Sequence, residues 1–189
     1  MIVTGTKDEV ATELDELDTF LAACGVNTKW FSARELCVLP FAKRADNAAG
    51  YTRPAPARKR NEVFAIPPPE LRPNLVRVLV RVAQPIRAQY GRPLDIRCYR
   101  PEPYNSLVAG AKGSRHRIAE ALDLRVMPGG SLEGLRRVAI DYVLDNPEIG
   151  IGLGLYRTDV HVDTREDSKV WGTQKELFEH ERKRRERSR

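Results

Sequence analysis

Three stretches of the chain carry apolar side chains at helical spacing, which predicts amphipathic helices. The three stretches are residues 9–24, 70–90 and 132–144. A charged helix is also expected near the C-terminus, at residues 174–187. Gly25 stands where the first helix would end, and Ser131 is a suitable N-cap for the third. Pro73 fits the first turn of the second helix, whereas Pro85 should kink its last part.

Alternation of apolar and polar residues predicts strands in the second half of the chain. The strands, and the glycine-alternating segment before the last of them, cover residues 94–98, 118–126, 150–155 and 159–163. In the last strand the alternation puts Asp159, His161 and Asp163 on one side. Residues 101–113 are expected to form a loop, and the Ala-, Pro- and Arg-rich residues 43–60 a longer exposed one.

The composition is ordinary for a soluble enzyme with one principal core. Of the 189 residues, 41% are hydrophobic and 31% charged, and no apolar run approaches the roughly 20 residues of a membrane-spanning helix. The first residues lack the basic and apolar regions of a secretory signal peptide, so we expect synthesis in a cytoplasm. Cys24, Cys37 and Cys98 fit neither a disulfide framework nor a zinc ribbon, and we expect them to be small buried side chains.

The chain is basic, with a net charge of +6 and a pI near 9.4. This balance favours approach to polyanions such as nucleic acid, anionic lipid or the acidic polymers of bacterial walls. The basic run at residues 182–189 is typical of a solvated tail. A nucleic-acid-binding module would rest on the pI and this tail, because no helix-turn-helix or aromatic stacking platform supports it. We therefore expect no specific nucleic-acid partner.

Two of the three histidines are candidates for chemistry. His180 lies in the charged C-terminal helix, where a surface histidine is the simple explanation, whereas His116 and His161 lie beside strand-like segments and near carboxylates. A catalytic zinc ion takes three protein ligands from His and carboxylate and leaves a fourth position to water. His116, Asp123 and His161 could supply that set, although their spacing by itself favours ordinary structural residues.

The motifs around these residues resemble those of a known family. Residues 114–123, Ser-Arg-His-Arg-Ile-Ala-Glu-Ala-Leu-Asp, resemble the Ser-x-His-x-x-Gly-x-Ala-x-Asp signature of the zinc D-alanyl-D-alanine carboxypeptidases. Their relatives include phage L-alanyl-D-glutamate endolysins and hedgehog-like murein endopeptidases. Residues 85–105 look like the family's helix, strand and Gly-Tyr-Arg-Ser-Pro...Asn loop. Residues 152–171 are similar to its Gly-x-Gly-x-Tyr...Val-His-Val-Asp...Trp stretch, so the motifs agree in order over residues 70–172.

The resemblance implies a ligand set and a fold. His116, Asp123 and His161 would ligate Zn²⁺ and leave a water whose pKa falls to about 7. The fold would be α+β, with a small antiparallel sheet bearing the zinc site and helices packed around it. We expect an N-terminal helix with an extended Pro/Arg-rich loop, a zinc peptidase core, and a basic C-terminal helix or tail. These parts would cover residues 1–66, 67–173 and 174–189.

The resemblance also implies substrate-binding residues. Arg100 would hold a substrate carbonyl or carboxylate and stabilise oxyanion charge, since its guanidinium is a fixed fork of donors. An ordinary surface salt bridge is the alternative for this residue. Ser114 would orient substrate or fix the metal loop, and Asn105 belongs to the same predicted substrate-binding set.

Departures from the family pattern bear on catalysis. Many members carry Glu or Asp three residues before the last histidine, where it acts as general base. Thr158 occupies that place here. Asp159 is the preferred substitute, because it should share a strand face with His161, and Asp163 is a second candidate.

Two further departures concern the backbone and a neighbouring loop. Ala119 stands where the signature has Gly, and a position that needs positive φ would strain alanine. Arg97-Cys98 replace the usual Ser-Gly. The Thr158 and Ala119 departures favour an alternative function, a virion structural or interaction protein that keeps the peptidase scaffold with weak or lost catalysis.

The leading hypothesis is a zinc-dependent peptidase that hydrolyses the stem peptides of peptidoglycan at a bond involving a D-amino acid. The likeness to phage members suggests a phage-encoded lysis or virion-associated enzyme, with other virion proteins as further partners. It would act at the bacterial cell wall or within a phage particle.

Overall fold

The computed structural model describes residues 7–39, 64–102 and 104–188. The loop expected at residues 43–60 lies outside these described residues. The fold class is α+β, as predicted. The chain divides into two compact units, one of Met1–Val76 with Arg97–Glu120 and one of Arg77–Ile96 with Ala121–Arg189. The division into an N-terminal part, a core and a basic tail stays a prediction.

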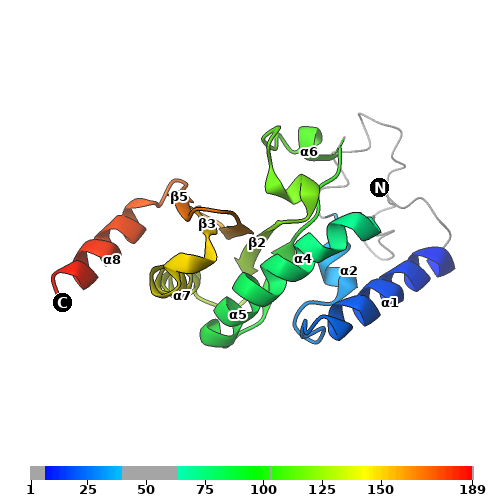
Figure 1. The fold of residues 1–189 in the computed structure, drawn as a ribbon, viewed down its shortest axis with the longest axis horizontal. Coiled ribbons are helices and arrows are strands. Elements are labelled where there is room, and N and C mark those ends of the chain that lie inside the picture. Colours follow the sequence, from blue (N-terminus) through cyan, green and yellow to red (C-terminus); the bar gives the residue numbers. More distant parts are fainter. Residues whose placement is uncertain (1–6, 40–63, 103, 189) are drawn as a thin grey trace. The chain divides into compact units, whose positions relative to one another are not determined.

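The first unit begins with two packed helices (Figure 1). Helix α1 (Lys7–Ala23) was predicted at residues 9–24. Its apolar stripe is buried and consists of Leu14, Leu17 and Leu21. The Ala33 amide at the start of α2 (Ala33–Cys37) donates to the Asp18 carboxylate of α1 at 2.6 Å. This bond satisfies an N–H group that the short helix cannot pair internally.

The second part of this unit holds the loop between strands β1 (Leu94–Arg97) and β2 (Ala121–Val126). Residues 101–113, predicted as a loop, contain the short helix α6 (Tyr104–Leu107), and η3 (Arg115–Ile118) follows as a 3₁₀ turn. Asn74 Nδ2 donates to the Ile118 carbonyl at 3.0 Å. The side chain of one helix thus caps the end of η3.

The cysteines are free thiols in different environments. Cys37 and Cys98 are buried, as expected, and burial raises the pKa of the Cys37 thiol well above its ordinary value. Cys24 is exposed, contrary to the expectation, because it lies beyond the last residue of α1.

The segment predicted as one helix at residues 70–90 is helical throughout but changes type. In order it comprises η1 (Pro69–Leu71), α4 (Arg72–Val78), the π-helical turn η2 (Leu79–Ala83) and α5 (Gln84–Tyr90). Pro85 lacks an N–H group, so the Arg81 carbonyl four residues before it has no α-helical donor. Tyr142 Oη donates to that carbonyl at 2.6 Å. The π turn beside Pro85 is where the predicted disturbance of the helix occurs.

The second unit is built on a five-stranded mixed sheet. Its strands are β1 (Leu94–Arg97), β2 (Ala121–Val126), β3 (Ile151–Leu155), β4 (Val160–Thr164) and β5 (Lys169–Trp171), in the order β1-β2-β4-β3-β5 (Figure 1). The β2–β4 and β3–β4 pairs are antiparallel, as expected, whereas β5, which the sequence did not predict, runs parallel to β3.

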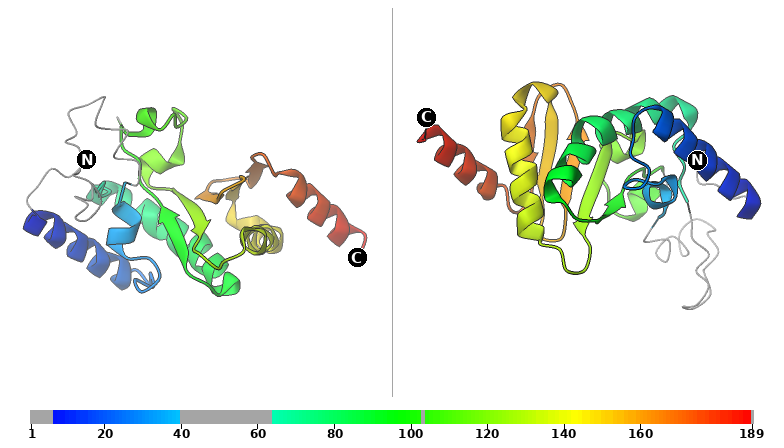
Figure 2. Two further views of the ribbon diagram at one scale, coloured as in Figure 1. Left: turned by 180° about the vertical axis from the view of Figure 1, so that it is seen from behind. Right: turned by 90° about the horizontal axis from the view of Figure 1, so that it is seen from below.

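The alternation along β2 and β4 gives this sheet two different faces. Leu122 pairs with Val162 and Leu124 with Val160, so one face is apolar. Helix α7 (Leu132–Asp145) packs against this part of the sheet and contacts α5, and it lies alongside the strands in Figure 2. As predicted, the Ser131 side chain caps α7 by accepting from the Gly134 amide. The other face carries polar side chains.

Helix α8 (Glu176–Glu186) follows the sheet, close to its predicted bounds. Arg185 ties it to α7 by donating to Asp141 and Asp145, each at 2.5 Å. His180 is exposed on α8, as expected of a surface histidine. Within the described residues, no helix has the length and apolar character needed to cross a membrane.

Candidate metal centre

Two of the predicted ligands are directly opposite each other in the sheet. Asp123 of β2 pairs with His161 of β4 in the antiparallel register. Side chains at such paired positions project to the same face. His161 Nδ1 and Asp123 Oδ1 are 2.9 Å apart, and both side chains are partly exposed. The strand register, and not the sequence spacing, is what brings these residues together.

A second carboxylate contacts the other nitrogen of the same imidazole. Asp163 Oδ2 lies 3.1 Å from His161 Nε2, and Arg165 donates to both oxygens of Asp163. Burial opposes protonation of His161, but the hydrogen bonds that its ring donates to Asp123 and Asp163 outweigh burial and raise the pKa of His161. Burial likewise opposes ionisation of Asp163, yet its bonds to His161 and Arg165 lower the pKa of this carboxyl. The pocket therefore favours a positive charge at His161.

The third predicted ligand, His116, is buried in η3. Its Nδ1 lies 2.6 Å from the Cys98 carbonyl oxygen, so Nδ1 carries the proton and donates. The lone pair is then on Nε2, where it accepts from Arg100 Nη2 at 2.9 Å. The Arg100 amide also donates to the His116 carbonyl at 3.0 Å. His116 is thus held as the tautomer that presents Nε2 to a cation.

Ala119 ends η3 in the left-handed conformation, with φ 57° and ψ 24°. This is the condition under which the sequence predicted strain, because an L-residue in this region costs about 1–2 kcal/mol. The strained turn lets the Ala119 amide donate to the His116 carbonyl at 3.3 Å and the Glu120 amide to the Arg115 carbonyl at 3.0 Å. These bonds close η3 around His116 and lead the chain into β2.

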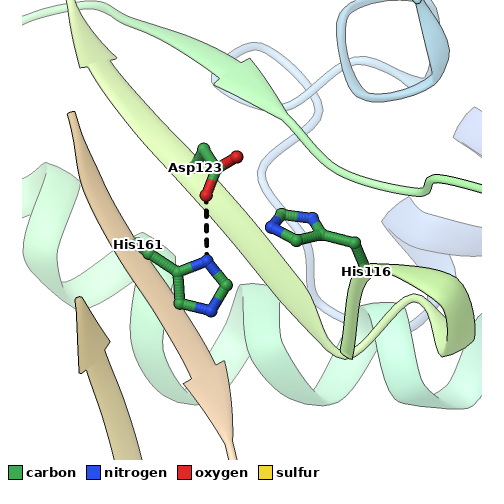
Figure 3. Close-up of side chains that lie close together, drawn as sticks. All are labelled: His116, Asp123 and His161. Carbon is green, nitrogen blue, oxygen red and sulfur yellow. Dashed lines mark hydrogen bonds and ion pairs between the residues drawn. The ribbon is translucent and has the colours of Figure 1, made fainter. Parts of the chain in front are cut away.

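The three predicted ligands gather in one cluster. One ligand atom from each of His116, Asp123 and His161 lies within 4.8 Å of the other two, as Figure 3 shows. Two imidazoles and one carboxylate are the donor set of catalytic zinc sites. Each imidazole also has a partner at its other nitrogen, the Cys98 carbonyl and the Asp163 carboxylate, as metal-binding histidines almost always do. The residues therefore fit a zinc ion.

Two predicted substrate-binding residues lie in the loop before η3. Ser114 lines a pocket of about 530 Å³. The charged side chains at this pocket are Glu102, Lys112 and Arg117. Asn105 is buried, and its Nδ2 bonds Glu102 Oε1 at 3.1 Å and the carbonyls of Gly110 and Ala111. These contacts stay within the loop, and substrate binding by Ser114 and Asn105 stays a prediction.

The candidate bases differ in their surroundings. Asp159 is half-buried just before β4, in the turn that Tyr156 N closes by donating to its carbonyl at 3.1 Å, and it accepts from Thr158 Oγ1 at 2.8 Å. Asp163 is only 1% exposed, with His161 and Arg165 as partners. The identity of the base stays a prediction.

Sequence reasoning missed two contributors to this centre. Arg165, which grips Asp163, continues the alternation His161, Asp163, Arg165 by one further step, and this signal could have identified it. The Cys98 carbonyl has no such signal, because any residue could supply it. Its contribution follows from the path of the backbone alone.

Comparison with known proteins gives a match at the level of the family. The model of a family described as Peptidase M15 matches residues 56–163, which is more than half of the chain. No curated protein matches the sequence.

Proposed function

The chain belongs to the Peptidase M15 family, and on this premise we propose that it is a zinc-dependent peptidase that hydrolyses the stem peptides of peptidoglycan. The family match confirms the resemblance to the zinc D-alanyl-D-alanine carboxypeptidases. The observation that carries the proposal is the cluster of His116, Asp123 and His161. All three lie inside the matched residues.

His116, Asp123 and His161 would hold the ion, which would supply Lewis acidity and lower the pKa of a water so that it could serve as a nucleophile near neutral pH. The protein's own part is to fix the direction of both imidazole rings. The Cys98 carbonyl does this for His116 and the Asp163 carboxylate for His161.

Arg100 would bind the substrate beside the ligands. Its guanidinium already lies 2.9 Å from His116 Nε2, so a substrate carbonyl or carboxylate close to the ligands would be within its reach. A guanidinium carries its charge at every working pH and offers several donors in one plane, which suits it to oxyanion charge that develops during hydrolysis.

Asp159 is the proposed general base. Thr158 stands where relatives carry an acid, and its hydroxyl donates to Asp159 Oδ2. Asp159 also lies two residues before His161, in the turn that leads directly into β4. Asp163 is the weaker candidate, because His161 and Arg165 already engage its carboxylate. Removing a general base typically slows a reaction by about 10²–10⁴-fold.

The family and the net charge of +6 support a peptidoglycan substrate, since bacterial walls are anionic. The motif likeness to phage endolysins leads us to propose a phage-encoded enzyme that acts at the wall or in a virion. A non-catalytic virion scaffold is the second candidate, and Thr158 at the place of the usual base favours it.

Metal analysis combined with peptidoglycan digestion tests the proposal. The wild-type protein should bind one zinc ion per chain and release new amino groups from purified peptidoglycan, with the cut bond identified by mass spectrometry. His161→Ala should lose both properties, whereas His180→Ala, at the exposed histidine of α8, should keep them. A folded wild-type protein that binds no zinc would overturn the proposal. Stoichiometric zinc without released amines from several wall types would favour the scaffold.

A further inference from the structure

On the polar face of the sheet, a series of contacts links the predicted ligand His161 to Asp163 and then to Arg165. Asp163 accepts at both oxygens from Arg165, with Nε–Oδ1 at 2.7 Å and Nη2–Oδ2 at 2.5 Å. The same Oδ2 lies 3.1 Å from His161 Nε2. A paired guanidinium and carboxylate have a fixed geometry, so Asp163 cannot turn away from His161 without losing a charged hydrogen bond.

Trp171 contacts both His161 and Arg165, the two residues that flank Asp163 in this series of contacts. The Arg165 guanidinium lies over the Trp171 ring, 4.8 Å from its centroid. The His161 ring lies on the same indole, with centroids 5.3 Å apart and planes tilted by 57°. Trp171 is fixed in turn, because its Nε1 donates to Tyr156 Oη at 2.7 Å. His161 and its acidic partner thus share one aromatic support.

Two glycines of β3 make room for this arrangement. Gly152 pairs with Asp163 and Gly154 with His161 across the β3–β4 ladder. A Cβ atom at Gly152 would lie 2.2 Å from Asp163 Oδ1, and one at Gly154 would lie 3.0 Å from His161 Cβ. Neither glycine has positive φ, so space and not backbone conformation requires glycine here. The missing side chains at Gly152 and Gly154 therefore leave the space that Asp163 and His161 occupy.

We propose that Asp163, clamped by Arg165 on Trp171, is a positioning residue that makes His161 a metal ligand through Nδ1. Asp163 is clamped by Arg165, so when an ion takes the place of one ring proton, Asp163 would keep the Nε2–H and the lone pair would lie on Nδ1, the atom beside the predicted ligand Asp123. This inference rests on the proposed zinc function. It gives Asp163 the role of orienting His161, and a residue in that role does not act as the general base.

Zinc affinity of the full chain, measured by competition with a chromogenic chelator, tests the inference. Asp163→Asn and Arg165→Met should each weaken zinc binding by about 10–100-fold, the usual effect of removing a hydrogen-bond partner of a ligand. Asp167→Asn and Arg157→Met make the same chemical changes at exposed positions that flank β4, and both should bind zinc like the wild type. Melting curves in chelator confirm that each variant is folded.

Nitrogen-15 NMR shows which nitrogen of the His161 imidazole carries the proton. A purely structural role of Asp163 would leave this tautomer unchanged. In the zinc-loaded wild type, His161 should carry its proton on Nε2. In Asp163→Asn an amide N–H₂ facing the ring favours the opposite tautomer, as an asparagine in place of an orienting aspartate is known to do. Unchanged affinity and tautomer in a folded Asp163→Asn variant would overturn the inference and leave the zinc function intact. A wild type without zinc would overturn the proposed function itself.

Discussion

Replacing Gly152 by alanine should destabilise the protein even when no metal is bound. The new Cβ would lie 2.2 Å from Asp163 Oδ1 and 2.6 Å from Arg165 Nε, far inside van der Waals contact. The Asp163 carboxylate cannot move away from the new Cβ without breaking its hydrogen bonds to Arg165 and His161. Overpacking costs about 1–3 kcal/mol, and breaking a charged hydrogen bond costs about 1.5–3 kcal/mol.

Alanine also gains about 0.5–1 kcal/mol over glycine inside a strand, since it loses less backbone entropy on folding. The expected net loss is therefore about 1.5–5.5 kcal/mol in the free energy of unfolding. Urea titration in the presence of chelator measures it. Gly113→Ala is the matched control, because no atom lies within 4 Å of its Cβ position, and it should be nearly neutral. Equal unfolding free energies for Gly152→Ala and the wild type would refute the argument that β3 requires glycine for space.

Three further outcomes are expected. Ser131→Ala should lower the free energy of unfolding by about 1 kcal/mol, seen in urea titration, because α7 loses its N-cap. A thiol reagent should modify Cys24 in the native protein but Cys37 only after unfolding, as peptide mapping would show, since burial raises the pKa of Cys37. The hydrogen bond from Arg184 lowers the pKa of Glu181 from 4.5 to about 2, so its stabilising effect is present above pH 4.5 and lost as the pH falls through about 2. Glu181 lies on the surface of α8, half-buried, and its ion pair should contribute little. The small difference in unfolding free energy between the wild type and Glu181→Gln should vanish below about pH 2.

Local signals explain what the sequence could predict. The N-cap Ser131 and the apolar stripe of α7 act within one helix, and Ala119 was identified as a strained position because the family motif has glycine there. The short elements α6 and β5 were missed, because three or four residues contain no measurable period. β5 also pairs with β3 in parallel, a contact that depends on the tertiary fold.

The candidate site shows the same limit. The ligand set was inferred from motifs, but the pairing of Asp123 with His161 joins residues 38 positions apart, and no local pattern specifies that register. Asp163 was predicted as a possible base from its place on the strand face. Its burial and its contact with Arg165 depend on the glycines of the neighbouring strand, which is information that only the folded sheet contains.

The Asp123–His161 pairing has a consequence for how the chain would resist proteolysis. An ion held by both side chains would close a ring of backbone that includes α7 and β3, much as a disulfide between the two positions would. A protease nick inside that ring would leave the fragments joined for as long as the ion stayed bound. Chelation would then remove one link between the two fragments, as reduction removes a disulfide, and leave the β2–β4 and β3–β4 ladders to hold them.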